Sequence, residues 1–322
     1  MRPAFSVLFL TTLIGAGQGL LIALVAGQLF FVVGTGQASE TSGFYAIGAV
    51  LALVLLGLGL LASFFHLANP QRAWRAATRW RTSWLSREVI ALPAVMGLTV
   101  LYGGLHWLEL DTTLLHFANG KSLDLTMAAG FALVGACFAL FLCTGMIYAC
   151  VKFIPEWASV WTVINYTLIG LASGFTLAAA YAASFGSVLT GLFSAGALVL
   201  IVAALAGRGI SLWRNARIRP LASLKGAIGA PHQNIRQVSQ GFGGKSFNTT
   251  EFFHGVSDDT VKALVVFCLF AGFVAPAALV LMGAHGLLWA AVIVQYVGLL
   301  AERWVFFAQG NHVQNLYYQR KA

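Results

Sequence analysis

Long apolar runs separated by short polar segments are the dominant pattern along this chain. Eight such runs cover residues 5–33, 43–65, 86–108, 126–151, 158–182, 187–207, 262–282 and 286–308. A helix of about 20 apolar residues crosses a hydrocarbon core of roughly 30 Å. The runs lack the alternation typical of barrel strands, so each is predicted to be a helix that satisfies its backbone hydrogen bonds internally. The pattern predicts an all-α integral membrane protein, a bundle of eight transmembrane helices.

The composition supports this interpretation. Hydrophobic residues make up 59% of the 322 residues and charged residues only 9%, which excludes a soluble globular domain of this size. The first run is too long for the apolar core of a signal peptide, and no convincing cleavage site follows it, so we expect it to remain as a span. Residues 1–322 are predicted to form a single polytopic membrane domain, whose largest extramembrane segment is the cytoplasmic loop 208–261.

Cationic residues predict the orientation. With eight spans, both termini and the second, fourth and sixth loops share one side of the membrane. All 19 Lys and Arg residues except Lys121 lie on that side. Because cytoplasmic loops carry an excess of Lys and Arg, we expect a bacterial inner-membrane protein with both termini in the cytoplasm. The net charge of +9 then mainly reflects this topology. Anionic lipid and an acidic partner protein both remain as candidates for what the positive side contacts, and no nucleic acid is expected.

The polar bridge between the second and third runs, residues 66–88, contains the most informative sequence. Asn69 and Pro70 are typical of a helix start, and Arg72, Arg75 and Arg79 then recur on one face of a short helix. This spacing predicts an amphipathic helix lying along the membrane surface. Its arginines are candidates for contact with lipid or for docking of a partner subunit: Arg72, Arg75, Arg79 and Arg81.

Two titratable residues, His66 and Glu88, lie at the ends of this bridge. A purely structural interpretation remains open, in which Ser83 or Ser86 caps the next helix and Glu88 complements the helix dipole from the first turn. The functional interpretation assigns proton transfer to His66 and Glu88, because a histidine and a partly buried carboxyl are suited to giving and taking protons. Quinone reduction requires such groups, and we expect the quinone site to include His66, Trp84, Ser86, Arg87, Glu88 and Gly17.

The same stretch resembles a known family. The letters HLANPQRAWRAATRWRTSWLSRE of residues 66–88 are similar to the His-Leu-Gly-x-Pro … Ser-Trp-Leu-Ser-Arg-Glu signature of the DMSO reductase membrane-anchor (DmsC-type) family, with Ala68 in place of the usual Gly. Residues 1–7 and the glycines from Gly15 to Gly19 look most like anchors of cytoplasmic sulfite dehydrogenases. The resemblance implies an anchor that exchanges electrons with the quinone pool, menaquinone or ubiquinone, with His66 and Glu88 at the quinol site. It places an iron–sulfur subunit and a molybdopterin catalytic subunit, which carry the other cofactors, on the cytoplasmic face.

Other classes of function remain as alternatives. The anchor could serve a DMSO or S-oxide reductase that oxidises quinol, or the protein could be a multi-span transporter. No metal site is expected, because the four cysteines lie in apolar spans at spacings unlike iron–sulfur motifs. No haem is expected either, since no two histidines fall at similar depth within the spans. Gly170 and Gly174 are spaced for close helix packing rather than for binding a ligand.

Overall fold

The computed structural model describes residues 1–35, 40–65, 67, 69–116, 122–219, 222–229, 231–232, 234–236, 238–239 and 251–315. Within them, eight helical segments are long and apolar enough to cross a membrane, as the hydrophobic pattern predicts. They are α1 (Phe5–Phe30) with η1 (Phe31–Thr35), α2 (Ser42–Phe64), α3 (Trp84–Trp107), α4 (Leu125–Ala149), α5 (Val160–Ser184), α6 (Leu189–Asn215), α9 (Asp258–Leu269) with η3 (Phe270–Val274) and α10 (Ala275–Met282), and α11 (His285–Gln309).

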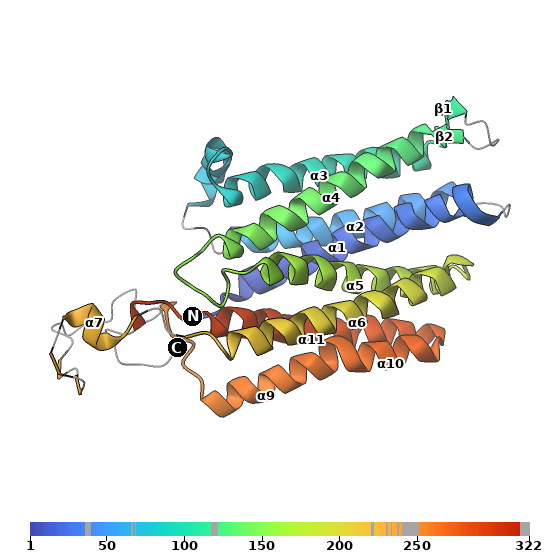
Figure 1. The fold of residues 1–322 in the computed structure, drawn as a ribbon. Helices are drawn as coiled ribbons and strands as arrows, with labels where there is room; N and C mark the ends of the chain where they lie inside the picture. Colours follow the sequence, from blue (N-terminus) through green and yellow to red (C-terminus); the bar gives the residue numbers. More distant parts are fainter. Residues whose placement is uncertain are drawn as a thin grey trace.

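The helices run side by side, with polar segments gathered at one end (Figure 1). That end contains the N-terminus, the 3₁₀ helix η2 (Pro70–Arg79) and the short helix α7 (Leu224–Ile228), and we call it the basic end. The opposite end has a small antiparallel hairpin, β1 (Thr113–His116) and β2 (Ser122–Asp124), in which Thr113 pairs with Asp124. This hairpin is an addition to the all-α prediction.

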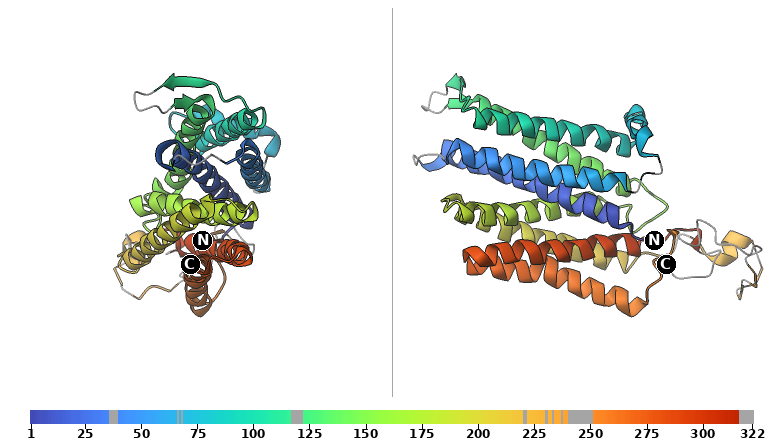
Figure 2. Two further views of the ribbon diagram at one scale, coloured as in Figure 1. Left: turned by 90° about the vertical axis from the view of Figure 1, so that its right-hand side faces the viewer. Right: turned by 180° about the vertical axis from the view of Figure 1, so that it is seen from behind.

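Helices α1 and α5 form the centre of the bundle. Viewed along the helices, α3 and α4 lie on one side of this pair and α9, α10 and α11 on the other (Figure 2). Residues Ile14–Val25 of α1 are buried on every side, which is typical of a helix surrounded by other helices. The two helices cross at glycines: a Cβ atom on Gly19 would overlap the carbonyl oxygen of Gly170, and one on Gly174 would overlap the backbone of Gly19. The predicted packing role of Gly170 and Gly174 is confirmed.

Most predicted span limits agree with the helices to within two residues, and the exceptions have local causes. The seventh helix begins at Asp258, before the apolar run, because the Ser257 hydroxyl caps it by accepting a hydrogen bond from Thr260 N–H at 3.2 Å. The sixth helix continues to Asn215 instead of ending at 207. Arg208 therefore lies inside α6 and is only 2% exposed. It is not part of the predicted cytoplasmic loop 208–261.

The bridge between α2 and α3 also differs from the expected α-helix. Residues Pro70–Arg79 form a 3₁₀ helix, unusually long for this class, with no side-chain hydrogen bond from Asn69 at its start. With three residues per turn, Arg72 and Arg75 align along the helix, but Arg79 is rotated about a third of a turn from them. The predicted single arginine face is therefore wrong in detail, although Arg72, Arg75, Arg79 and Arg81 are all exposed.

Candidate functional site

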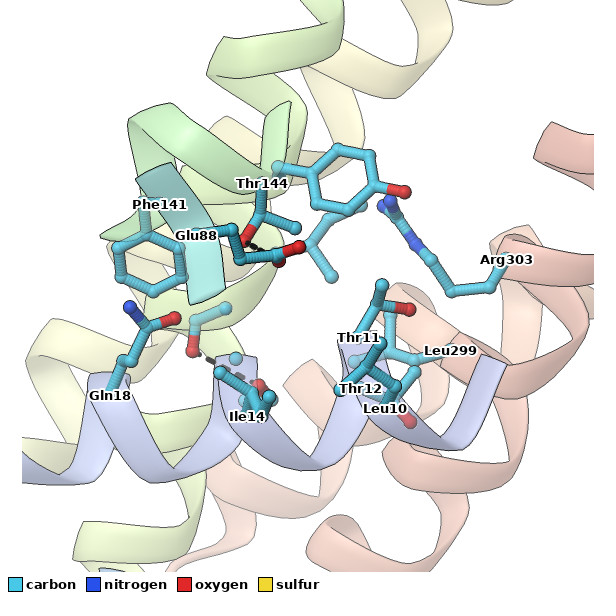
Figure 3. A pocket seen from close by; sticks show the side chains of 15 residues that line it. Leu10, Thr11, Thr12, Ile14, Gln18, Glu88, Phe141, Thr144, Leu299 and Arg303 are labelled. Carbon is cyan, nitrogen blue, oxygen red and sulfur yellow. Dashed lines mark hydrogen bonds between the residues drawn. The ribbon is translucent and has the colours of Figure 1, made fainter. Parts of the chain in front are cut away.

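A small, partly enclosed cavity of about 20 Å³ lies between α1, α3, α4, α5 and α11 (Figure 3). It is nearer the basic end, because its lining comes from the first half of α1, the start of α3 and the last turns of α4 and α11. A cavity of this size has room for about one water molecule. We call it the Glu88 cavity, after the single acidic side chain among its lining residues.

Glu88 extends into this cavity from the second turn of α3. The helix begins at Trp84, capped by the Ser83 hydroxyl, so Glu88 lies about 6 Å along the helix axis from its start. It is not in the first turn, so the interpretation of Glu88 as a partner of the helix dipole is wrong. Instead, its Oε1 accepts a hydrogen bond of 2.6 Å from the Thr144 hydroxyl of α4. Oε2 has no hydrogen-bond partner within the part of the chain that the structure describes, so it is free to contact a ligand.

The floor of the cavity is formed by small and apolar groups of α1 and α5. Gly15 and Gly170 both line it, and the ring of Phe141 lies against Gly170 so closely that any side chain at position 170 would displace it. Gln18 also lines the cavity and donates a 3.0 Å hydrogen bond from Nε2 to the carbonyl of Cys137. Gln18 therefore joins α1 to α4 by a hydrogen bond. The wall opposite the carboxyl group therefore combines apolar groups with hydroxyl and amide side chains.

Arg303 of α11 closes the side of the cavity opposite α3 (Figure 3). Its guanidinium carbon lies 4.0 Å from the centre of the Tyr166 ring, and its Nε is 2.6 Å from Glu302 Oε2. Glu302 Oε1 in turn pairs with Arg208 Nε at 3.0 Å. A buried positive group and a carboxyl group thus border the same space from opposite sides.

The residues predicted for the quinone site do not all line the Glu88 cavity. Glu88 lines the cavity, whereas Trp84, Ser86 and Arg87 are absent from its lining. Ser86 is 3% exposed. Arg87 stacks on Trp84 with its guanidinium carbon 4.1 Å from the ring centre. It also donates hydrogen bonds to the carbonyls of Trp80 and Arg81, at 2.9 and 3.0 Å, so it fastens the bridge to α3.

Gly17 and His66 are the two remaining residues predicted for the quinone site. Gly17 packs against α2, where an added Cβ would lie 3.2 Å from the carbonyl oxygen of Ala52, and it is replaced in the cavity lining by Gly15. His66 lies outside the described residues. Its described neighbour Phe65 is 80% exposed at the end of α2, at the basic end of the bundle.

Sequence reasoning missed Thr144 and Arg303 as cavity residues. Thr144 had no distinguishing signal, because a threonine in an apolar helix usually bonds to its own backbone. Arg303 had one: the adjacent Glu302 and Arg303 fall inside the eighth apolar run, where ionisable residues are expensive and mark functional sites. Glu302 and Arg303 form an ion pair, and Glu302 also pairs with Arg208.

Cysteine and histidine positions give no sign of a metal centre in the described part of the chain. No group of three or more His, Cys, Asp or Glu side chains there is arranged to hold a metal ion. Cys137, Cys143 and Cys268 are buried free thiols, and Cys150 is an exposed one.

Comparisons with known proteins agree on one family. The family model described as DMSO reductase anchor subunit (DmsC) matches residues 1–308. A sulfite dehydrogenase subunit of Allochromatium vinosum is 48% identical over 326 residues, which cover the whole of both proteins.

Two Escherichia coli proteins match shorter parts. Anaerobic dimethyl sulfoxide reductase chain YnfH is 28% identical over 170 residues, 51% of this chain and 56% of that protein. A second anaerobic dimethyl sulfoxide reductase chain of the same organism is 28% identical over 123 residues, 38% of this chain and 39% of that protein. With eight apolar helices and a family match over almost its full length, this chain is a multi-pass membrane protein that belongs to the DMSO reductase anchor subunit family.

Proposed function

We propose that this chain is the quinone-reactive anchor of a three-subunit molybdopterin and iron–sulfur oxidoreductase, and that the complex oxidises sulfite in the cytoplasm. The full-length similarity to a protein named as a sulfite dehydrogenase subunit supports this assignment over an S-oxide reductase anchor. The molybdopterin and the clusters belong to the partner subunits in this proposal. The anchor supplies the membrane site at which electrons reach the quinone pool.

The observation that carries the proposal is the Glu88 carboxyl group, which lines a cavity within the bundle and has one oxygen without a hydrogen-bond partner among the described residues. Reduction of a quinone to a quinol consumes two electrons, here from the iron–sulfur partner, and two protons at the carbonyl oxygens. Thr144 holds one oxygen of Glu88, which leaves the other to hydrogen-bond a quinone carbonyl and transfer a proton to it. The cavity has room for about one water molecule, so a quinone ring enters it only when the surrounding helices move apart.

His66 is proposed as the second proton-transfer group. In the sequence it comes directly after Phe65, the C-cap residue of α2 at the basic end, and the start of α3 with Glu88 lies at the same end. A histidine titrates near neutral pH and can pass protons between the solution and the site.

The partner subunits are proposed to dock at the basic end, on the cytoplasmic side of the inner membrane. The exposed arginines of the bridge support this, and two of them stack on exposed tryptophans: Arg75 on Trp74 at 5.6 Å and Arg81 on Trp80 at 5.4 Å. Arginine and tryptophan are enriched in protein interfaces. Both termini then lie in the cytoplasm.

Substitution of Glu88 by Gln tests the function. Glu88→Gln preserves the shape and the hydrogen bond from Thr144 but cannot donate a carboxyl proton. We expect electron exchange with a short-chain quinone in membrane vesicles to fall about 100-fold, the lower range for loss of a positioned acid. Sulfite oxidation with a soluble dye, which bypasses the quinone, should be unchanged.

The matched control is Glu109→Gln, which changes an exposed residue just beyond the other end of α3. It should leave both activities at the level of the native complex. Unchanged quinone exchange in Glu88→Gln would refute the proposed site, and a complex without sulfite activity in the dye assay would refute the proposed substrate.

A further inference from the structure

A second, smaller cavity of about 10 Å³, which has room for about one water molecule, lies at the basic end between α5, α6 and α11. Its outer lining includes Glu156, in the connection between α4 and α5, and Asn215, the last residue of α6, both of which are partly exposed. Tyr166 and Arg303 line this cavity and the Glu88 cavity alike. The two spaces are therefore neighbours with the stacked Tyr166 and Arg303 side chains as their common wall.

The second cavity contains an ionic cluster that the proposed quinone chemistry does not use. Glu302, with 1% of its side chain exposed, lies between Arg208 and Arg303, each with 3% exposed. The three formal charges leave one positive charge unneutralised inside the cluster. Buried charges cost several kcal/mol each unless they are paired and solvated, so a helix bundle retains such a cluster only at a cost.

Four buried polar atoms of this cavity have no hydrogen-bond partner among the residues that the structure describes: Arg208 Nη2, Arg303 Nη1, Asn165 Oδ1 and the Tyr166 hydroxyl. Two of them are donors, Asn165 Oδ1 is an acceptor, and the hydroxyl can act as either. Water satisfies both kinds of atom, whereas an anion would satisfy only the donors. Each buried polar atom left without a partner costs about 1–3 kcal/mol, which favours ordered water in the cavity.

We propose that water in the second cavity connects Glu88 with the solution at the basic end, and that protons pass the wall formed by Tyr166 and Arg303. This inference rests on the proposed function, since it explains how Glu88 regains a proton after giving one to a quinone oxygen. The step is proton transfer alone: an O–H bond of a water molecule breaks, an O–H bond forms at the Glu88 carboxylate, and the next water along the passage replaces the proton. No electron moves along this route.

Substitution of Arg303 by Gln tests the route. The variant leaves Arg208 and Glu302 as a neutral pair, so it does not leave a buried charge without a partner. In membrane vesicles that contain the whole complex, we expect proton uptake and quinone reduction to slow by about tenfold or more and to depend more steeply on D₂O. The rates are compared at saturating quinone, with binding measured separately by fluorescence of a quinol analogue, and millimolar acetic acid should restore part of the rate by delivering protons directly.

Tyr166→Phe, which removes only the hydroxyl group from the common wall, is the second variant, and it should slow proton uptake in the same way. Arg217→Gln is the matched control, because Arg217 is exposed and stacks on Trp213 outside both cavities. Native rates of proton uptake in both Arg303→Gln and Tyr166→Phe, in vesicles where Glu88→Gln is impaired, would overturn the route and leave the proposed function standing. Native rates in Glu88→Gln as well would overturn both.

Discussion

Substitution of Gly19 by Ala tests the close crossing of α1 and α5. A Cβ at position 19 would lie 2.9 Å from Gly174 Cα and 3.1 Å from the carbonyl carbon of Gly170. Carbon atoms in contact are usually about 3.5–4.0 Å apart, so the helices would have to separate by roughly 0.5–1 Å. Such overpacking costs about 1–3 kcal/mol, of which the better helix propensity of alanine returns up to about 1 kcal/mol. We expect the free energy of unfolding to fall by about 1–2 kcal/mol.

The measurement is reversible unfolding of the anchor in mixed micelles by SDS titration, followed by tryptophan fluorescence. Gly97→Ala on α3 is the matched control, because no atom lies within 4 Å of a Cβ built at that position. It should be neutral or stabilising by up to about 1 kcal/mol. Equal stability of Gly19→Ala and Gly97→Ala would refute the close crossing. Because Gly15 and Gly170 line the Glu88 cavity, Gly19→Ala should also weaken the binding of a quinol analogue.

Three further predictions concern the site, the docking surface and pH. Thr144→Val removes the hydrogen bond to Glu88, worth about 0.5–1.5 kcal/mol, and should slow quinone exchange by up to about tenfold. Thr176→Val, which loses only a bond to its own helix, should leave the rate of quinone exchange unchanged. Charge reversal at Arg75 and Arg79 should release the partner subunits into the soluble fraction after salt washing, and full retention would favour contact with lipid alone. Burial lowers the pKa of His312, which stacks on Phe252 at 4.1 Å, so the folded contact binds a proton less readily than the free side chain. The contact is then stable above about pH 6.5 and weakens below it, and hydrogen exchange of residues 251–254 should rise at about pH 5.5 in the native protein but not in His312→Gln.

The eight spans are predictable because length and hydrophobicity alone decide whether a helix crosses a bilayer. The limits that differ depend on specific pairs instead. The Ser257 cap begins the seventh helix before its apolar run, and the pairing with Glu302 allows Arg208 to lie within the sixth. A hydropathy pattern cannot reveal either interaction. The Ser257 cap is a local hydrogen bond, and Arg208 and Glu302 meet only through the tertiary fold.

The candidate site is likewise only partly predictable from the sequence. Glu88 is predictable as a carboxyl group within an apolar helix, where such groups are rare. Its surroundings are not, because they come from five helices that are distant in the sequence. Arg87 and Trp84 are near Glu88 in the sequence but point to the bridge, since successive residues of a helix face different directions. They therefore do not line the Glu88 cavity, whereas Thr144 and Arg303 line it without having been predicted.

The glycine crossing has a mechanical consequence for how a ligand reaches Glu88. Backbone against backbone cannot be compressed, and α1 and α5 have no side chains at the crossing that could change rotamer to make room. The crossing of α1 and α5 is therefore rigid, and the cavity can widen only if the helices packed against these two move. Glu88 and its partner Thr144 belong to two of these, α3 and α4, and Arg87 attaches the start of α3 to the arginine-rich bridge. A subunit bound to the bridge would therefore restrict the movement of α3, and with it the side of the cavity that can move. Docking of that subunit and access of a ligand to Glu88 would then be coupled.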